Sequence, residues 1–355
     1  MNRDFYYRPK VAVAVLGATG MVGQRFIERL ANHPWFELVA LAASDRSAGH
    51  VYQDIVDWKL DTPIPEKFGK MKVLPCEPTL ECDLVFSALD SSIAGDIETS
   101  FAKAGYVVVS NASSHRTTPL VPMIVAEVNS NHLQLVKQQS YHQKGMIITN
   151  PNCIAAPLAL ALRPLQLEFG LKHVQVTTLQ SLSGAGFIDT QRKGIANNII
   201  PWIKDEEEKI ERETASLLGE MDKNEINPLP IAISAQCNRV PIPFGHMMAV
   251  SVKLQEKVSE NDLLAAWKEF SGNIPTIDLP SAPNPPIRLA EREDHPQPID
   301  DLYHGKGMTI TVGRVQKCPV NDYKFVILSN NTVRGAAGEA ILTAEILLKD
   351  GYLFW

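Results

Sequence analysis

Cys153 is the residue whose surroundings most strongly suggest chemistry. It lies in ITNPNCIAAPLALAL, residues 148–162, between a Pro-Asn turn and an apolar run with helical potential. A thiol at or just before a helix start meets the positive end of the helix dipole and unpaired N–H groups, which stabilise a thiolate and can lower its pKa. The same N–H groups can hold an oxyanion after the sulfur attacks a carbonyl. The pattern predicts a nucleophile.

The other four cysteines have weaker settings. Free cysteines are commonly buried as small hydrophobes, and we expect this of Cys76, Cys82 and Cys318. Cys237 is the second candidate nucleophile, but its strand-like surroundings lack a helix start. Cys76 and Cys82 have no matching second pair, so a zinc site is not expected, and no metal is expected elsewhere.

A thiolate nucleophile usually works with a proton-transfer partner. Among the nine histidines the distinctive one is His246, in SAQCNRVPIPFGHMMAVSV. The same stretch offers Arg239 on an expected strand, and arginine is the natural bidentate partner of a carboxylate. Taken singly, each of the two residues would more often be a surface group.

The start of the chain has a nucleotide-binding pattern. KVAVAVLGATGMVGQRFIERLANH begins with an apolar β-branched run, residues 11–16, and passes through Gly17, Gly20 and Gly23 into an amphipathic helix. Such glycines permit a tight turn and close backbone approach, and the N–H groups of the helix start attract a phosphate. The alternative is a glycine-rich turn that binds no ligand.

The end of the next expected strand bears on the choice of cofactor. FELVALAASDRSAG places Ser44, Asp45, Arg46 and Ser47 there. An arginine with two hydroxyls suits a 2′-phosphate, which favours NADP, whereas Asp45 could hold the ribose diol of NAD.

The whole chain suggests about two domains, since 355 residues exceed one small core. Further strands are expected in CDLVFSAL and YVVVSNAS, and strands alternating with helices predict a doubly wound parallel (Rossmann) sheet. The net charge of -6 gives no general attraction to nucleic acid or membrane. An odd cysteine count without a signal-peptide core suggests the cytoplasm.

Six ordered motifs together closely resemble aspartate-β-semialdehyde dehydrogenase, in its archaeal and fungal branch, over residues 11 to about 348. They are GATGMVGQRF, SNASSHR, NPNC, LQSLSGAG, CNRVPIPFGH and NNTVRGAAGEAIL. The resemblance implies an oxidoreductase of amino-acid biosynthesis (lysine, diaminopimelate, threonine, methionine, isoleucine). This family uses NADPH to reduce L-aspartyl-4-phosphate to aspartate semialdehyde, releasing inorganic phosphate.

By this resemblance, Cys153 attacks the acyl carbon and forms a thioacyl enzyme, His246 is the general acid/base and Gln180 positions the intermediate. Charged and polar groups would hold the substrate. Arg239 matches the group for the α-carboxylate and Glu206 the one for the ammonium, with Glu207 and Glu208 as rivals. Arg116, Asn152 and Lys209 match phosphate contacts.

The resemblance also implies cofactor contacts along the chain. They are Gly17, Thr19, Gly20, Met21 and Val22 for the pyrophosphate, Ser44, Arg46 and Ser47 for the 2′-phosphate, Ser87 and Ala88 at a strand end, Ser183 and Gly184 near the nicotinamide, and Asn331 and Thr332 in a late segment. We expect an NADP-binding domain over 1–152, completed by a helix in 334–355. An α+β catalytic and dimerisation domain would cover 153–333, in a homodimer or homotetramer. The Pro-rich residues 279–298 would form an ordered loop near a subunit contact.

One departure from the family is Met247, where a small or hydroxyl residue usually follows the histidine. Three alternatives stay open. A malonyl-CoA reductase of the same superfamily would expel coenzyme A instead of phosphate. An N-acetylglutamyl-phosphate reductase fits CNRVPIPFGH poorly. A non-catalytic NADP-binding sensor would not need Cys153, Gln180, Arg239 and His246 together.

Overall fold

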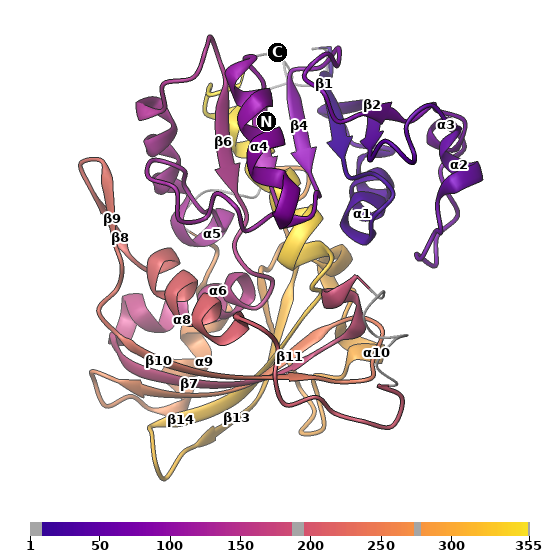
Figure 1. The fold of residues 1–355 in the computed structure, drawn as a ribbon. Helices are drawn as coiled ribbons and strands as arrows, with labels where there is room; N and C mark the ends of the chain where they lie inside the picture. The colour runs from indigo at the N-terminus through magenta and orange to yellow at the C-terminus, as the bar shows by residue number, and fades with distance from the viewer. Residues whose placement is uncertain (1–8, 187–194, 273–277, 354–355) are drawn as a thin grey trace.

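A computed structural model describes residues 9–186, 195–272 and 278–353 (Figure 1). The first half builds a six-stranded sheet in the order β3-β2-β1-β4-β5-β6, and every neighbouring pair is parallel. This order brings the loops after β1 and β4 together at a topological switch point, where doubly wound folds bind nucleotides. The predicted fold class and the strands expected in CDLVFSAL and YVVVSNAS are confirmed. The strands are β1 (Val11–Leu16), β2 (Phe36–Ala43), β3 (Leu74–Pro75), β4 (Leu84–Ser87), β5 (Val107–Ser110) and β6 (Met146–Thr149).

The C-terminal helix α11 (Gly338–Lys349) belongs to the core of this first sheet. Its residues 338–348 are all buried. Ile341 and Leu347 share one apolar cluster with Val13, Phe26 and Phe86. Figure 1 shows this helix, in yellow, in the upper layer. The last helix therefore supplies core that the first 152 residues lack. Residues 1–8 and 354–355 of the expected domain lie outside the described residues.

A second six-stranded sheet is mixed, in the order β10-β7-β11-β14-β13-β12. β7 pairs parallel with β10 and antiparallel with β11. This sheet makes the predicted α+β domain. Its strands are β7 (Leu171–Gln180), β10 (Ala232–Arg239), β11 (His246–Leu254), β12 (Ile287–Leu289), β13 (Ile310–Lys317) and β14 (Tyr323–Ser329).

Three helices cover one face of the second sheet: α6 (Ala155–Phe169), α8 (Glu206–Leu217) and α9 (Glu260–Glu269). They form an apolar cluster with the inward side chains of the strands, such as Val176 and Phe325. In Figure 1 these helices lie on the side of the sheet that faces the first domain. Alternate residues of β7 are exposed, and Leu179 is 37% exposed. The sheet therefore has one covered and one open face in the single chain.

The remaining elements are short or connect these layers, and they include the helices α1 and α4 beside the first sheet. None of the described helices is long and apolar enough to cross a membrane. They are α1 (Met21–Leu30), α2 (Tyr52–Ile55), α3 (Glu66–Gly69), α4 (Ser91–Lys103), α5 (Ala126–Asn129), η2 (Ser130–Gln138), η3 (Leu182–Ala185), β8 (Glu220–Asp222), β9 (Glu225–Asn227), α10 (Pro298–Asp301), η5 (His304–Gly307) and η6 (Val333–Ala337).

Candidate active site

The three glycines after β1 differ in the physical reason for which glycine stands at each position. Gly17 has φ +77°, and a Cβ there would lie 2.5 Å from the carbonyl oxygen of Ala88. A Cβ at Gly23 would lie 2.2 Å from the Gly17 carbonyl oxygen, so this glycine permits helix–strand packing. At Gly20 the nearest atom would be 3.5 Å away. Packing within the chain does not require glycine there, which is consistent with room for a ligand at the start of α1.

The other groups predicted for a dinucleotide surround this turn. The first turn of α1 has no side-chain cap. The N–H groups of Gly17 and Ala18 donate to Ala42 O at the end of β2, at 2.8 and 3.0 Å. Ser44 and Arg46 follow that strand end and are exposed. Among the remaining predicted groups, Thr19, Val22, Ser47 and Ala88 are half-buried, whereas Met21 and Ser87 are buried.

Asn331 and Thr332 are buried and make internal hydrogen bonds. Asn331 Oδ1 accepts from the N–H of Gly245 at 3.0 Å, and its Nδ2 donates to Ser183 Oγ at 2.9 Å. Thr332 Oγ1 accepts from Arg25 Nε at 3.0 Å. Their side chains therefore join the η3 loop, the start of β11 and α1. A cofactor contact from this segment stays a prediction.

Cys153 lies just before Ile154, the N-cap of α6. Asn152 Oδ1 accepts hydrogen bonds from the N–H groups of Ile154 at 2.8 Å and Ala155 at 3.3 Å. Because the preceding side chain occupies them, these two N–H groups are not open to an oxyanion in this structure, and an oxyanion site at the helix start stays a prediction. Asn152 retains its amide Nδ2 as a group that could reach a phosphate.

The predicted lowering of the Cys153 pKa is wrong. Burial raises the pKa of the thiol to about 12, and the negative charge of Glu206 adds to this. Arg239 and Arg116 act in the opposite direction but are outweighed. The residue keeps some accessible surface, although the surrounding protein removes most of the hydration that a thiolate would need. In the ligand-free site, desolvation exceeds the effect of the helix start.

His246 is fully buried at the first position of β11. The N–H of Ser181 donates to its Nδ1 at 3.1 Å, so the neutral ring carries its proton on Nε2. Nε2 has no hydrogen-bond partner among the described residues. Burial, and then the charge of Arg239, lower the pKa of His246 to about 3. A Cβ on Gly184 would lie 3.0 Å from Nε2 and 2.8 Å from Arg239 Nη1, so glycine is needed to leave these two groups room.

Arg239 and Gln180 lie opposite each other at the ends of β10 and β7. Arg239 Nη1 donates to the carbonyl oxygen of Ser181 at 2.7 Å. Gln180 Nε2 donates to Glu206 Oε1 at 2.8 Å, which brings the start of α8 to the same strand ends. Gln180 therefore links the two opposite charges predicted for a substrate's two termini, and the charges of both Arg239 and Glu206 act on the pKa of the Cys153 thiol.

The three adjacent glutamates have different roles in the structure. Glu206 contacts Gln180, as above. Glu207 Oε1 accepts from the N–H of Cys237 at 2.9 Å, on the edge strand β10. Glu208 is exposed. The geometry thus favours Glu206 over its two rivals for a substrate contact.

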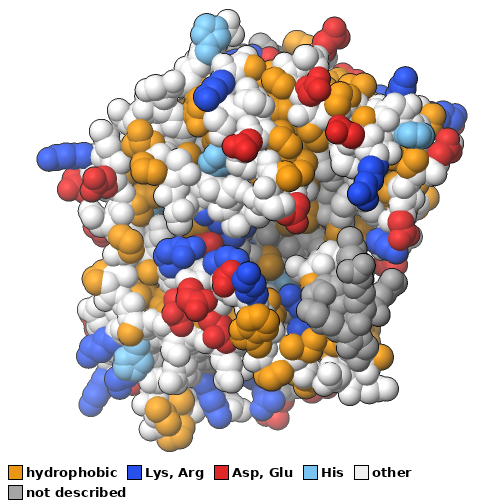
Figure 2. All heavy atoms as spheres, in the orientation of Figure 1, with side chains coloured by type: hydrophobic (Ala, Val, Ile, Leu, Met, Phe, Trp, Pro, Cys, Tyr) orange, Lys and Arg blue, Asp and Glu red, His pale blue; other side chains and the backbone are white. Residues whose placement is uncertain are grey.

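Arg116 lies in the loop after β5 and pairs with Glu213, a residue that the sequence reasoning missed. Arg116 Nη1 is 3.3 Å from both carboxylate oxygens, and Glu213 Oε2 accepts from the N–H of Asn152 at 2.6 Å. The available signal was helical spacing, since Glu213 lies one turn beyond Lys209 and two beyond Glu206. Lys209 is half-buried on α8. Figure 2 shows acidic and basic side chains gathered over the α8 region, between the two sheets.

Cys237 is fully buried in the core of the second domain, and burial raises the pKa of its thiol to about 12. Its lower rank as a nucleophile is consistent with this position. Cys76, Cys82 and Cys318 are half-buried free thiols. Within the described ranges, no group of three or more His, Cys, Asp or Glu side chains is arranged to hold a metal ion.

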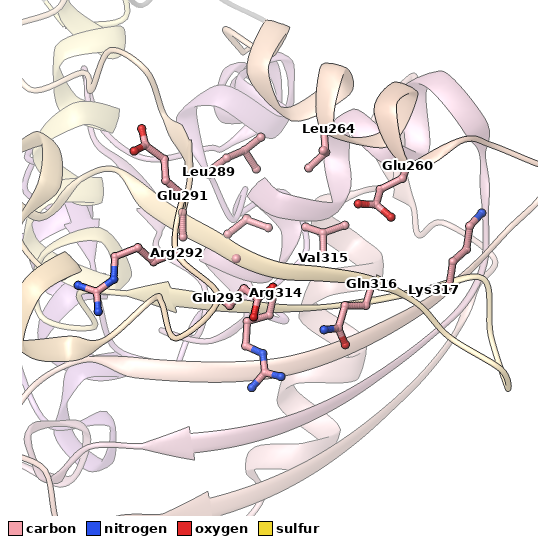
Figure 3. A pocket seen from close by; sticks show the side chains of 13 residues that line it. Glu260, Leu264, Leu289, Glu291, Arg292, Glu293, Arg314, Val315, Gln316 and Lys317 are labelled. Carbon is pink, nitrogen blue, oxygen red and sulfur yellow. The ribbon is translucent and has the colours of Figure 1, made fainter.

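A cavity of about 450 Å³ lies away from these residues, among α9, β12 and β13 (Figure 3). Glu260, Glu291, Arg292, Arg314 and Lys317 are among its lining side chains. None of the predicted site residues lines it, so it is not part of the candidate active site.

Comparisons with known proteins agree with this geometry. Residues 12–136 match the family described as semialdehyde dehydrogenase, NAD binding domain, and residues 162–334 match its dimerisation domain. Aspartate-semialdehyde dehydrogenase of Archaeoglobus fulgidus is 44% identical over 344 residues, covering 96% of this chain and 99% of that protein. The Cryptococcus neoformans enzyme of the same name is 43% identical over 361 residues, covering 98% and 99%.

Solved structures show the same similarity. Aspartate semialdehyde dehydrogenase with NADP from Candida albicans has a TM-score of 0.88 at 40% identity, covering 97% of this chain and all of that chain (100%). Aspartate semialdehyde dehydrogenase II from Vibrio cholerae has a TM-score of 0.77 at 25% identity, covering 96% and 99%.

Proposed function

The chain belongs to the aspartate-semialdehyde dehydrogenase family, and from this membership we propose that it converts L-aspartyl-4-phosphate to L-aspartate 4-semialdehyde with NADPH. The reaction releases inorganic phosphate and supplies the biosynthesis of lysine, threonine, methionine and isoleucine. The observation that carries the proposal is the set of charges around one thiol. Arg239 lies opposite Gln180, which contacts Glu206, and Arg116 is joined through Glu213 to the N–H of Asn152. Groups suited to a carboxylate, an ammonium and a phosphate thus gather beside Cys153.

The cofactor site fits a phosphorylated dinucleotide. Gly20 leaves room at the uncapped start of α1 for a pyrophosphate, and Arg46 with Ser44 and Ser47 would hold a 2′-phosphate. NADPH supplies a hydride when bound. NADP is therefore proposed over NAD, and no metal is needed for this chemistry.

The substrate would be held at both ends of its amino-acid part. The Arg239 guanidinium would bind the α-carboxylate, and Glu206, fixed by Gln180, would bind the ammonium group. Arg116, Lys209 and the Asn152 amide would bind the phosphate. Bound in this way, the substrate would have its acyl carbon near the Cys153 sulfur, where a new C–S bond would replace the C–O bond to phosphate.

His246 would act on the acyl oxygen and on the thiol proton. In the ligand-free site its Nε2–H is a donor, suited to stabilise the negative charge that develops on the acyl oxygen. To accept the thiol proton at Nε2, the ring must first hold its own proton at Nδ1. Ser181 Oγ, 3.2 Å from Nδ1, is the group that could accept a hydrogen bond from it.

The direct test is the reverse reaction. Purified protein is given aspartate semialdehyde, phosphate and NADP, and formation of NADPH is followed by absorbance. We expect turnover that requires phosphate and is lower with NAD. Oxidation of NADPH with malonyl-CoA, without phosphate-dependent oxidation of aspartate semialdehyde, would instead identify the malonyl-CoA reductase. Cofactor binding without turnover of either would identify the sensor.

The protein is a homo-oligomer by family, since a dimerisation domain covers residues 162–334. We propose a homodimer or a pair of dimers that covers the open face of the second sheet, where Leu179 is exposed. A cytoplasmic location is proposed because the described cysteines are free thiols.

A further inference from the structure

Glu213 is a buried carboxylate that joins two parts of the candidate site. It is 1% exposed on the face of α8 that looks toward the first domain. One of its oxygens accepts from the backbone N–H of Asn152, the residue directly before Cys153, at 2.6 Å. Both oxygens share a single nitrogen of Arg116, which comes from the first domain. The carboxylate thus contacts the nucleophile turn and the predicted phosphate-binding arginine at once.

The two contacts of the Glu213 carboxylate differ in length. The bond from Asn152 N–H is short, whereas both distances to Arg116 Nη1 are 3.3 Å. Charge-assisted bonds of guanidinium to carboxylate are usually about 2.7–2.9 Å. Arg116 Nη2 donates to Asn111 O at 2.9 Å, and its Nε is buried with no hydrogen-bond partner among the described residues. The backbone therefore holds Glu213 firmly, and Arg116 keeps unused capacity to bind a second anion.

We propose that Glu213 is a positioning residue that serves as the internal counter-ion of Arg116 until phosphate binds. The inference rests on the proposed function and extends it to this residue. The phosphate takes over part of the Arg116 guanidinium against the nearby negative charge of Glu213, which limits phosphate affinity and favours its release. Throughout the cycle Glu213 keeps its bond to Asn152 N–H and so holds the Cys153 turn in place.

The surroundings support a local charge role. Arg212 Nη2 is 3.8 Å from Glu213 Oε1, but its side chain is 53% exposed, so water screens it. Arg116 is only 9% exposed, so it needs an anion close by. Among the described carboxylates Glu213 is the one paired with Arg116, whereas Glu98, whose pKa burial raises, interacts with it only electrostatically.

Glu213→Gln tests the proposal because the amide keeps an oxygen for Asn152 N–H and loses the charge. In the reverse reaction, we expect KM for phosphate to fall at least about threefold and kcat to change much less. We also expect added phosphate to raise the melting temperature of the variant more than that of wild type. An unchanged or higher KM for phosphate would overturn the counter-ion role.

Glu211→Gln is the matched control on the same helix. Glu211 Oε1 accepts a backbone N–H, that of Ala235, at 2.9 Å, just as Glu213 accepts that of Asn152. We expect wild-type KM for phosphate and a wild-type response to phosphate in this variant. An equal fall of KM in both variants would attribute the effect to the general charge of α8 and reject the proposal.

A double variant, Arg116→Gln with Glu213→Gln, keeps the idea testable if the single variant does not fold. Removing both charges should restore folding, and phosphate should no longer raise the melting temperature. A wild-type-sized rise in the double variant would reject the proposal. Failure of the proposed function looks different, because wild type itself would then show no phosphate-dependent oxidation of aspartate semialdehyde.

Discussion

Cys153 shows that a nucleophile can be recognised from sequence although its ionisation cannot. The helix start was predicted correctly, but burial and Glu206 raise the pKa of the thiol to about 12 before any ligand binds. A neutral thiol is a poor nucleophile. In the ligand-free site the sulfur is therefore held as a thiol, and its proton must be removed when the C–S bond forms.

Replacing the sulfur tests its role directly. We expect Cys153→Ser to lose nearly all phosphate-dependent dehydrogenase activity and to bind NADPH with wild-type affinity, because the predicted cofactor contacts lie elsewhere. Initial rates and fluorescence titration with NADPH would measure the two effects. Cys318→Ser is the control and should keep wild-type rates. Wild-type turnover of Cys153→Ser would reject the nucleophile assignment.

His246 predicts a pH dependence of stability. Its pKa is lowered from 6.5 to about 3, so the folded chain binds fewer protons than the unfolded chain between these values. This contribution to stability is complete above about pH 6.5 and is lost as pH falls toward 3. We expect the unfolding free energy of His246→Asn to fall less steeply than that of wild type, by up to about 1.4 kcal/mol per pH unit.

Urea unfolding at about pH 6.5, 5.5 and 4.5, at one protein concentration, would measure this difference. His142→Asn, at an exposed position, is the matched control for the loss of one imidazole. If the unfolding free energies of wild type and His246→Asn changed in parallel with pH, the ring would not be held neutral by burial.

At the scale of elements, two glycines of the β1–α1 unit have separate roles, one in packing and the other in ligand binding. Gly23→Ala would place a Cβ against a backbone oxygen, whereas Gly20→Ala has space and φ -76°. We expect Gly23→Ala to lose about 1–3 kcal/mol of stability through overpacking. Gly20→Ala should fold as wild type does but bind NADPH at least about tenfold more weakly, because the methyl group occupies ligand space.

Thermal unfolding and NADPH titration of the two variants provide the comparison, each serving as the other's control. Equal melting temperatures would contradict the packing role of Gly23. Wild-type NADPH affinity of Gly20→Ala would contradict the placement of the pyrophosphate.

The elements also show which strands and site residues could be predicted from the sequence and which could not. β1, β2, β4 and β5 were predictable because apolar β-branched runs and turn residues are local signals. The order of the second sheet was not, since β7 pairs with β10 and β11 from distant segments. Glu213 was hidden because a glutamate in a charged helix resembles any solvated residue until α8 is placed against Asn152.

At the scale of the whole molecule, buried charges join α5 to the end of the chain. Arg334 Nη2 is 2.7 Å from Glu127 Oε2, and Arg334 Nη1 is 3.0 Å from Glu339 Oε2. The adjoining Gly335 packs on the nucleophile, since a Cβ there would lie 2.7 Å from Cys153 Cβ. The segment before α11 therefore contacts both domains.

A divided chain tests how far the first domain depends on that segment. We expect residues 1–152 alone to lack a cooperative thermal transition, because α11 contributes buried core to the first sheet. The same fragment with residues 334–355 joined by a flexible linker should regain one. Differential scanning calorimetry would decide, and a cooperative transition in the short fragment would contradict this expectation.

The place of α11 has a consequence for how the protein is made. The strands of the first sheet precede the second domain in the chain, but the helix that completes their interior follows that domain. Nascent chains usually complete their N-terminal domain first. Here the first domain must wait, with apolar strands incompletely covered, until the second domain and α11 have been translated as well.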